Sequence, residues 1–285
     1  MPFGFGRVQS VMVSLARRFA GLLVATCPIA VCAFSGSTAH AETIQTRYGI
    51  SLIGLPFGTA SVSGTIGPTY RVELNAKLTG LASILSSSKG AAVATGALES
   101  GRLKPAAYAN SSANSDMTRT VRMTVVNGNV DKTEITPPWD PFPDRVPVTE
   151  QDRRGIVDPM SALLMPLPPS ADPTGPAACN RTIPVYDGAA RFDITMAYVG
   201  TRQVKTKGYE GPVAVCSARY RPIAGHRANR PGTRFMAENK QIEAWLAPVG
   251  QTRILVPYRI SVMTMVGTVV IEASNFEVSP AAVTR

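Results

Sequence analysis

The sequence predicts a mainly β fold, built as one long antiparallel sheet of about ten or eleven strands with one or two short helices. Several stretches alternate apolar and polar residues with a period of two, which is typical of strands that bury one face. Turn signals that contain Gly, Pro or Asn separate these stretches at short intervals. Helical spacing of apolar residues is confined to two short segments, 80–88 and 158–164.

The N-terminal segment 1–41 has the order of a secretory signal peptide. A basic region without acidic residues comes first, and an apolar run over 19–34 follows it. This run is too short, and too interrupted by Pro28, for a transmembrane helix. Ala39-His40-Ala41 then forms an A-x-A cleavage site. We therefore expect export to the periplasm, cleavage after Ala41 and a mature protein that does not span the membrane.

The remaining chain, 42–285, is expected to form a single β-rich domain with a proline-rich insert at 137–176. The whole sequence contains 29 basic and 19 acidic residues, which gives a formal net charge of +10. Such an excess favours an anionic partner or surface in the long-range field. A solvated basic surface without a specific partner explains the same composition. Export argues against nucleic acid as the partner.

The first strands of the mature chain occupy the region up to residue 78. Tyr48, Ile50 and Leu52 alternate with more polar residues and predict an extended segment. The glycines and proline of 54–58 predict a turn, and a clean period of two returns over 70–78. These patterns predict three consecutive antiparallel strands.

Segment 80–88 has apolar residues at helical spacing and predicts one or two helical turns. Segment 90–98 is small and apolar, and Gly96 within it indicates a bulge or a close backbone approach. Strands resume from Pro105. Asn127-Gly128 predicts a type I′ hairpin turn, with positive φ at both residues.

The proline-rich insert begins at 137, where several prolines surround Trp139 and Phe142. Proline lacks the backbone N–H that an interior strand needs, so this run cannot lie inside a sheet. We expect an extended surface loop in which Trp139 serves as an anchor.

A short helix is predicted at 158–164 within this insert. Asp158 suits the N-cap, and Pro159 suits the first helical position. Met160, Leu163 and Leu164 form its apolar side. Two interpretations stand. The helix covers an open end of the sheet beside a ligand cavity, or it simply fills the core.

The C-terminal third contains the two cysteines that remain after cleavage, Cys179 and Cys216. In an oxidising compartment a structural disulfide between them is the expected state. Asp187-Gly188 predicts a hairpin turn, and Pro257 places its strand at an edge or a bulge. The strands predicted here are 183–186, 192–198, 213–220, 241–249, 254–262 and 268–276.

The residues that carry chemistry are few. His226 is the single histidine of the mature chain, which excludes a multi-histidine metal site. The sequence contains no G-x-S-x-G elbow and no matched acid and base, so we expect no enzyme, no cofactor and no metal. Arg219, Arg221, His226 and Arg227 cluster in sequence and are candidate contacts to a carboxylate or phosphate. A solvated basic rim is the alternative.

Several short motifs, spread over nearly all of the mature chain, together resemble DUF3108, a family of exported bacterial proteins of unknown function. The resemblance implies no activity and no catalytic residues. The strand-rich pattern with a short helix is also similar to the periplasmic lipoprotein-carrier fold. That similarity implies one strongly curved sheet, an incomplete β-barrel with short covering helices that holds an acyl chain. The motifs are Tyr48-Gly49-Ile50, Gly54-Leu55-Pro56-Phe57-Gly58, Val157-Asp158-Pro159-Met160-Ser161-Ala162-Leu163, Cys179, Val185-Tyr186-Asp187-Gly188, Arg191-Phe192-Asp193, Tyr209-x-Gly211-Pro212-x3-Cys216, Pro222-Ile223-Ala224-Gly225-His226 and Trp245-Leu246.

Two functional hypotheses follow. The first is a non-catalytic binding module for an apolar or lipid-like ligand, with Asp158, Met160, Leu163 and Leu164 at its cavity or cover. The second is a structural or assembly factor of the cell envelope that contacts another protein through a sheet edge or the proline-rich loop. A cavity between sheet and helix favours the first hypothesis. A solid core with an exposed patch of Trp139 and Phe142 favours the second.

Overall fold

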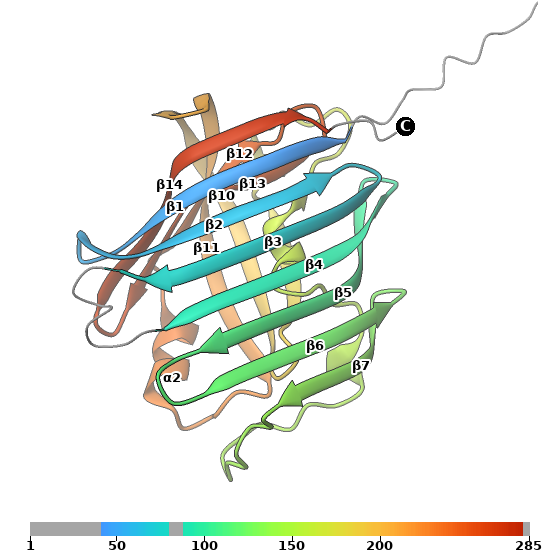
Figure 1. The fold of residues 1–285 in the computed structure, drawn as a ribbon, viewed down its shortest axis with the longest axis vertical. Helices are drawn as coiled ribbons and strands as arrows, with labels where there is room; N and C mark the ends of the chain where they lie inside the picture. The colour runs from blue at the N-terminus through green and yellow to red at the C-terminus, as the bar shows by residue number, and fades with distance from the viewer. Residues whose placement is uncertain (1–40, 80–87, 282–285) are drawn as a thin grey trace, which may run out of the picture. The chain divides into compact units, whose positions relative to one another are not determined.

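The computed structural model describes residues 41–79 and 88–281. The predicted signal peptide up to residue 40 and the helical turns predicted at 80–88, up to residue 87, lie outside the described residues. The described residues form one antiparallel sheet of 14 strands (Figure 1). Its N-terminal strands are β1 (Glu42–Leu52), β2 (Leu55–Ile66), β3 (Thr69–Leu78), β4 (Lys89–Glu99), β5 (Arg102–Ala113), β6 (Thr118–Val126) and β7 (Asn129–Thr136). Its C-terminal strands are β8 (Met165–Pro166), β9 (Arg181–Tyr186), β10 (Arg191–Thr206), β11 (Tyr209–Ala224), β12 (Ile242–Pro248), β13 (Ile254–Thr264) and β14 (Gly267–Pro280).

The strand count exceeds the ten or eleven that the sequence predicts. β4 is one addition, because Ala and Gly stand on both of its faces and leave no alternation to detect. β8 is another, since it has only two residues. Short strands of this kind are defined by their pairing partners and not by their own composition.

The strand order is that of a meander, joined across its two halves by β1 and β14. From one edge to the other it runs β7-β6-β5-β4-β3-β2-β1-β14-β13-β12-β11-β10-β9, and β8 pairs with β13. β1 pairs with β14 along its whole length, so the first strand meets the last. β7 and β9 stay apart at the two edges, and the sheet is not closed.

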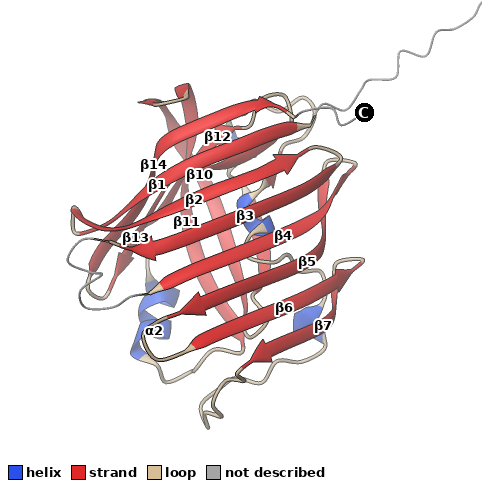
Figure 2. Cartoon of the chain, viewed as in Figure 1, coloured by secondary structure: helices blue, strands red, loops and turns tan. Residues whose placement is uncertain are grey.

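The sheet curves so that two parts of it face each other. In Figures 1 and 2, β10 and β11 cross behind β1 to β5 at a steep angle. One buried cluster joins residues of β1 and β3 with residues of β11 and β13, which places the core between these parts. The Tyr48 hydroxyl donates across this core to the carbonyl of Pro257 at 2.7 Å. The expected curved, open sheet is therefore present.

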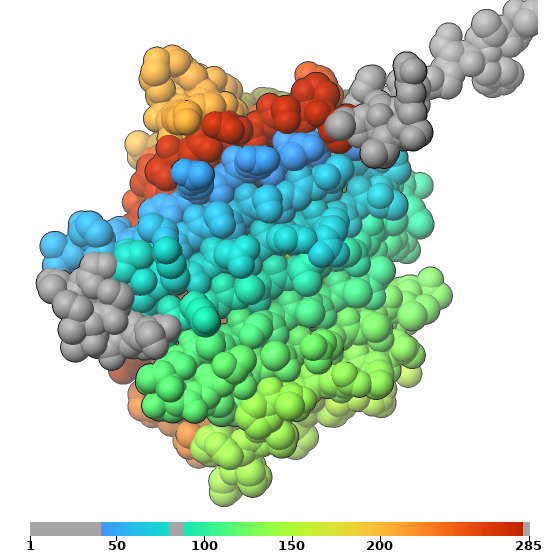
Figure 3. All heavy atoms as spheres, in the orientation of Figure 1, coloured from blue at the N-terminus to red at the C-terminus, as the bar shows by residue number. Residues whose placement is uncertain are grey.

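Alternation decides which side chains enter this core. On β3, Tyr70 and Val72 are buried while Arg71 between them is exposed. The opposite, outer face of β1 to β7 is the surface visible in Figure 3. β11 and β13 differ, because Val213–Cys216 and Ile254–Tyr258 are buried without interruption. A second apolar cluster covers the outer face of these strands, which explains their continuous apolar runs.

The insert supplies both of these covers. Met160 and Leu164 belong to the inner cluster, whereas Met165 and Leu167 belong to the outer one. β13 pairs with β14 only from Arg259 to Thr264, and its first residues pair with β8 instead. The insert thus passes from the inner to the outer face at the point where β13 and β14 separate.

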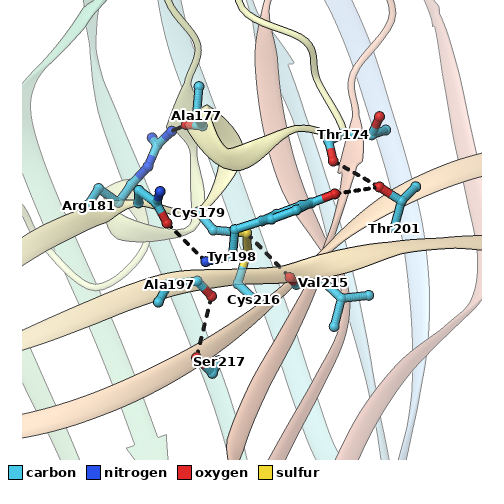
Figure 4. Close-up of a disulfide and its surroundings, with 11 residues drawn as sticks. Thr174, Ala177, Cys179, Arg181, Ala197, Tyr198, Thr201, Val215, Cys216 and Ser217 are labelled. Carbon is cyan, nitrogen blue, oxygen red and sulfur yellow. Dashed lines mark hydrogen bonds between the residues drawn. A yellow bond between two sulfur atoms is a disulfide. The ribbon is translucent and has the colours of Figure 1, made fainter.

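The predicted disulfide between Cys179 and Cys216 is confirmed. It fixes the end of the insert on the outer face of β11, with both cysteines fully buried and their Cα atoms 5.4 Å apart (Figure 4). Arg181 donates to the carbonyl of Ala177 at 2.7 Å and holds the last turn of the insert. The side chain of Asn180 accepts from the backbone N–H of Tyr198 on β10 at 2.9 Å.

Three predicted turn and bulge signals have clear outcomes. Asn127-Gly128 forms the predicted hairpin turn, with φ of 53° and 76°. Gly96 lies at a bulge, and a Cβ there would collide with the backbone carbonyl of Lys104, so both predictions for that glycine are confirmed. Pro257 also lies beside a bulge, between β12 and β13, and its strand is not at an edge.

The turn predicted at 54–58 is wrong in extent. Leu52 pairs directly with Leu55, so the turn consists of Ile53 and Gly54 alone. The rest of that segment already belongs to β2, where a bulge at Phe57, directly after Pro56, interrupts the pairing beside the proline that lacks an N–H.

The helices also differ from expectation. The helix predicted at 158–164 is a single 3₁₀ turn, Ser161–Leu163, and similar turns stand at Gln151–Arg153 and Pro176–Ala178. Pairing of Met165 in β8 ends the turn before a second one forms. The sequence analysis missed the α-helix α2 (Pro231–Glu238), whose signal was proline at its first position.

The loop around Trp139 is on the surface, as predicted. Its indole is 44% exposed, and the Arg119 guanidinium lies 3.8 Å from the ring centroid. The guanidinium of Arg227 covers Phe142 in the same way at 4.1 Å. Cation–π contacts thus fix the loop to Arg119 on β6 and to Arg227 in the segment between β11 and α2.

Candidate functional site

The interior turn of the insert is held by Asp158. Its side chain is fully buried, and Oδ1 accepts from the backbone N–H groups of Met160 and Ser161, both at 2.9 Å. These are the donors that a helical turn leaves unpaired at its start. The capping role predicted for Asp158 is therefore present, although the turn that it caps is short.

Asp158 also ends a chain of hydroxyl groups that reaches the sheet. Its Oδ2 accepts from the Ser161 hydroxyl at 2.5 Å, and that oxygen lies 2.7 Å from the hydroxyl of Tyr70 on β3. Since Ser161 donates its proton to Asp158, Tyr70 donates to Ser161. Burial raises the pKa of the Asp158 carboxyl above its usual range, against the opposing effect of these hydrogen bonds.

On the other side of this turn lies an apolar cavity of about 180 Å³. Met160, Leu163 and Leu164 form one wall, and the inner faces of β1, β2, β3, β13 and β14 form the rest. The hydroxyl of Tyr48 on this wall is already bonded to Pro257. The lining residues from the sheet are Ile44, Tyr48, Ile50, Ala60, Val62, Ile66, Val72, Leu74, Ala76, Val256, Pro257, Ile260 and Ile271.

The cavity extends toward one end of the sheet. Ile50 and Ala76 line it and also line a more open pocket of about 380 Å³ beside the ends of β1 and β3. Lys77, Lys89 and Met117 belong to that outer pocket. The apolar cavity thus lies next to a more open pocket that has positively charged residues at its rim.

The basic candidates of the sequence analysis are engaged within the fold. Arg219 donates to the carbonyl of Asn239 at 3.0 Å, and Arg221 pairs with Asp193 at 2.7 Å. Arg227 pairs with Asp144 at 2.9 Å. The Nδ1 atom of His226 is buried without a hydrogen-bond partner among the described residues. None of these four basic residues is among the described residues that line the cavity. Their contact with an anionic group of a ligand stays a prediction.

The sequence reasoning found the insert side of the cavity and missed the sheet side. Alternation on β1 and β3 identifies which residues face inward. It does not show that Ala60 and Ala76 are too small to fill the space between the sheet and Leu163. The cavity arises from these two small side chains and the short turn together.

Two further observations concern the described residues. No three His, Cys, Asp or Glu side chains among them gather in a way that would hold a metal ion. None of their helices has the length and apolar character needed to cross a membrane.

The fold and cavity define a class, an open β-barrel-like sheet around an apolar interior. Residues 44–274 match the family described as "Protein of unknown function (DUF3108)", and the chain belongs to this family, as the resemblance predicts. A crystal structure of a "Beta-barrel-like Protein of Domain of Unknown Function DUF1849" from Brucella abortus is similar, with 7% identity and a TM-score of 0.48. The match covers 85% of this chain and 98% of that one. No curated protein matches the sequence.

Proposed function

We propose that this protein is a non-catalytic binding module for an apolar or lipid-like ligand. The observation that carries the proposal is the cavity between the sheet and the turn at Ser161–Leu163. Its walls are aliphatic and its one tyrosine hydroxyl is internally bonded, so it favours hydrocarbon over polar groups.

The size of the cavity sets the part of the ligand that it holds. At about 180 Å³ it is smaller than the roughly 300–1,000 Å³ of sites for whole drug-sized ligands. It is comparable with apolar cavities of about 150 Å³ that admit benzene. The ligand is therefore expected to insert a short stretch of acyl chain, with the remainder toward the opening near Ile50.

Export to the periplasm is part of the same proposal. It is supported by the order of the N-terminal 41 residues and by the disulfide, which forms in oxidising compartments. The intact mass of the protein from the cell envelope tests it. A mature N-terminus other than Glu42 would reject the cleavage site.

The alternative of an assembly factor needs an exposed aromatic patch. The guanidinium groups of Arg119 and Arg227 each cover one face of Trp139 and Phe142, although the Trp139 side chain stays 44% exposed. The observations therefore give more support to a ligand in the interior than to a protein on this loop.

The test fills the cavity from the sheet side. Ala76→Leu adds an apolar side chain on the inner face of β3, and Ala60→Leu does the same on β2. Asn75→Leu is the matched control, because successive residues of a strand point to opposite faces. Binding is measured by fluorescence titration with cis-parinaric acid, and native mass spectrometry of the purified protein detects co-purified lipid.

We expect both alanine variants to bind the fatty acid at least about tenfold more weakly, a change of about 1.4 kcal/mol, while the control binds normally. Melting curves establish that all three variants are folded. Unchanged affinity in folded Ala76→Leu and Ala60→Leu variants would reject the interior as the binding site.

A further inference from the structure

The two hairpin turns beside the cavity opening carry exposed aliphatic side chains. Ile53 lies in the turn of the β1–β2 hairpin and Leu55 begins β2 directly after it; they are 67% and 70% exposed. Met265 and Val266 form the tip of the β13–β14 hairpin and are 61% and 69% exposed. These four residues, here called the apolar tip, are half of the eight large apolar side chains exposed in the described part of the chain.

The apolar tip is one continuous surface. The backbone N–H of Ile53 donates to the carbonyl of Thr268 on β14 at 2.9 Å, which joins the two hairpins. A Cβ on Gly267 would collide with the Ile53 side chain, so the two turns are in contact. A Cβ on Gly232, at the start of α2, would lie 4.0 Å from the Met265 sulfur. Figure 1 shows both hairpin ends on the left of the view.

Ile53 is an unfavourable residue for its own turn. Ile53 and Gly54 have φ of 53° and 77°, nearly the same as 53° and 76° for Asn127 and Gly128. Such turns favour Asn-Gly, and a β-branched residue in the left-handed region is strained. An isoleucine that is both strained and exposed does not stabilise the fold, and such sites point to a role in contacts with other molecules.

A pair of lysines at the same end of the sheet is also unfavourable for the stability of the fold. Lys77 and Lys89 stand directly opposite each other on β3 and β4, both exposed. Like charges in this position repel and weaken a sheet. Arg234 and Lys240, on and just after α2, add exposed positive charge, while Asp116 and Glu238 are exposed acids.

We propose that this end of the sheet docks on an anionic lipid bilayer. The apolar tip enters the boundary between headgroups and acyl chains, and Lys77 and Lys89 lie over the headgroup phosphates. The bilayer removes the aliphatic side chains from water and places negative charge beside the lysine pair. Docking goes beyond the proposed binding function, because it requires no ligand in the cavity. It does bring the opening near Ile50 to the lipid surface.

The experiment measures co-flotation of the protein, in the processed form that intact mass establishes, with vesicles. One set contains phosphatidylcholine with phosphatidylglycerol, and the other contains phosphatidylcholine alone. We expect binding to the anionic set that weakens as salt is added, because salt screens exposed charges. Absence of binding to anionic vesicles would overturn the proposal.

Ile53→Asn separates docking from folding. It gives the turn its preferred residue, so the melting midpoint should rise while vesicle binding falls at least about tenfold. Val126→Asn is the matched control, since Val126 is also exposed and precedes the turn at Asn127. Its vesicle binding should stay unchanged. Equal binding by the Ile53→Asn variant and the unaltered protein would contradict the proposal.

Lys77→Glu tests the contribution of the lysine pair to binding of anionic vesicles. It replaces repulsion with attraction to Lys89, so the sheet should gain stability while the preference for anionic vesicles is lost. A retained preference would refute the role of the lysine pair. A different outcome is also possible to detect: the protein self-associates with rising concentration, Ile53→Asn abolishes this association, and no vesicle binding occurs. That outcome would mean that the apolar tip binds a second copy of the chain, and it would overturn the lipid proposal.

These results are distinguishable from the test of the cavity. Ile53→Asn should still bind cis-parinaric acid, and Ala76→Leu should still float with anionic vesicles. Loss of fatty-acid binding alone would leave docking intact, and loss of docking alone would leave the proposed function intact.

Discussion

Replacement of Asp158 tests how the insert is held inside the sheet. Asp158→Ala removes the acceptor for two buried N–H groups, on Met160 and Ser161, while the Ser161 hydroxyl can still bond to Tyr70. Loss of a cap costs about 1 kcal/mol at an exposed site. Each buried donor left without an acceptor costs about 1–3 kcal/mol. With two such donors, we therefore expect the free energy of unfolding to fall by about 2–6 kcal/mol.

Asp158→Asn separates the charge from the hydrogen bonds. Its Oδ1 still accepts from both N–H groups, so the loss at neutral pH should be only about 1–2 kcal/mol. Because burial raises the pKa of Asp158 in the folded protein, its favourable contribution is present below the ordinary value of 3.8. That contribution is lost as pH rises through the raised folded pKa. The unaltered protein should thus lose stability relative to Asp158→Asn as pH rises above the ordinary pKa of 3.8 and through the raised pKa of the folded protein.

Urea denaturation at a series of pH values measures both effects. Asp172 provides a control in the same insert, because its exposed carboxylate accepts from Thr174 and this bonding lowers its pKa. Its stabilisation should be present above the ordinary pKa and lost as pH falls, the opposite sign. Parallel pH curves for the unaltered protein and Asp158→Asn would refute the reasoning about burial. A cost below about 1 kcal/mol for Asp158→Ala would refute the capping argument.

Two further predictions concern the anchors around the cavity. Cys216→Ser opens a link across 37 residues and should lower the free energy of unfolding by about 4 kcal/mol. Two free thiols in the denatured, unreduced protein would contradict the bond itself. Leu164→Ala removes a side chain that is 5% exposed and should cost about 2–5 kcal/mol in unfolding experiments. Leu163 is half-buried at the cavity, so Leu163→Ala should lower the free energy of unfolding less than Leu164→Ala does. It should change the affinity for cis-parinaric acid more than the melting midpoint. An equal loss of stability in both variants, with unchanged affinity, would show that the turn only fills the core.

Much of the sheet follows from local sequence rules. Period-two alternation identifies β1 and β3, and Asn127-Gly128 identifies its hairpin because few residues tolerate two positive φ angles in succession. Asp158-Pro159 identifies the start of a turn through the bonding of its backbone donors. In each case the decisive interaction lies within a few residues along the chain.

The features that sequence reasoning missed depend on distant partners. β8 exists because two residues of the insert reach the free start of β13. The cavity exists because Ala60 and Ala76 face Leu163 across the core, which no local pattern records. Ile53 also breaks the turn rule that identifies Asn127-Gly128, and the proposed docking on lipid gives a reason for this local violation.

The attachments of the insert restrict the route by which the proposed ligand enters the cavity. On the inner side, Asp158 is tied to β3 through Ser161 and Tyr70. Only a few residues later, Met165 pairs with Leu255, and the disulfide then holds the outer side. Before Asp158, the N–H of Val157 donates to the carbonyl of Pro184 at 2.8 Å and fixes the insert to β9.

A segment fastened at both ends over so short a span cannot swing away as a lid without breaking one of these attachments. Only side-chain motion of Met160, Leu163 and Leu164 remains available at the wall of the cavity. If the proposed function holds, the ligand therefore enters past Ile50 and Ala76, from the end that carries the apolar tip. The insert then acts as a fixed wall against which its acyl chain packs.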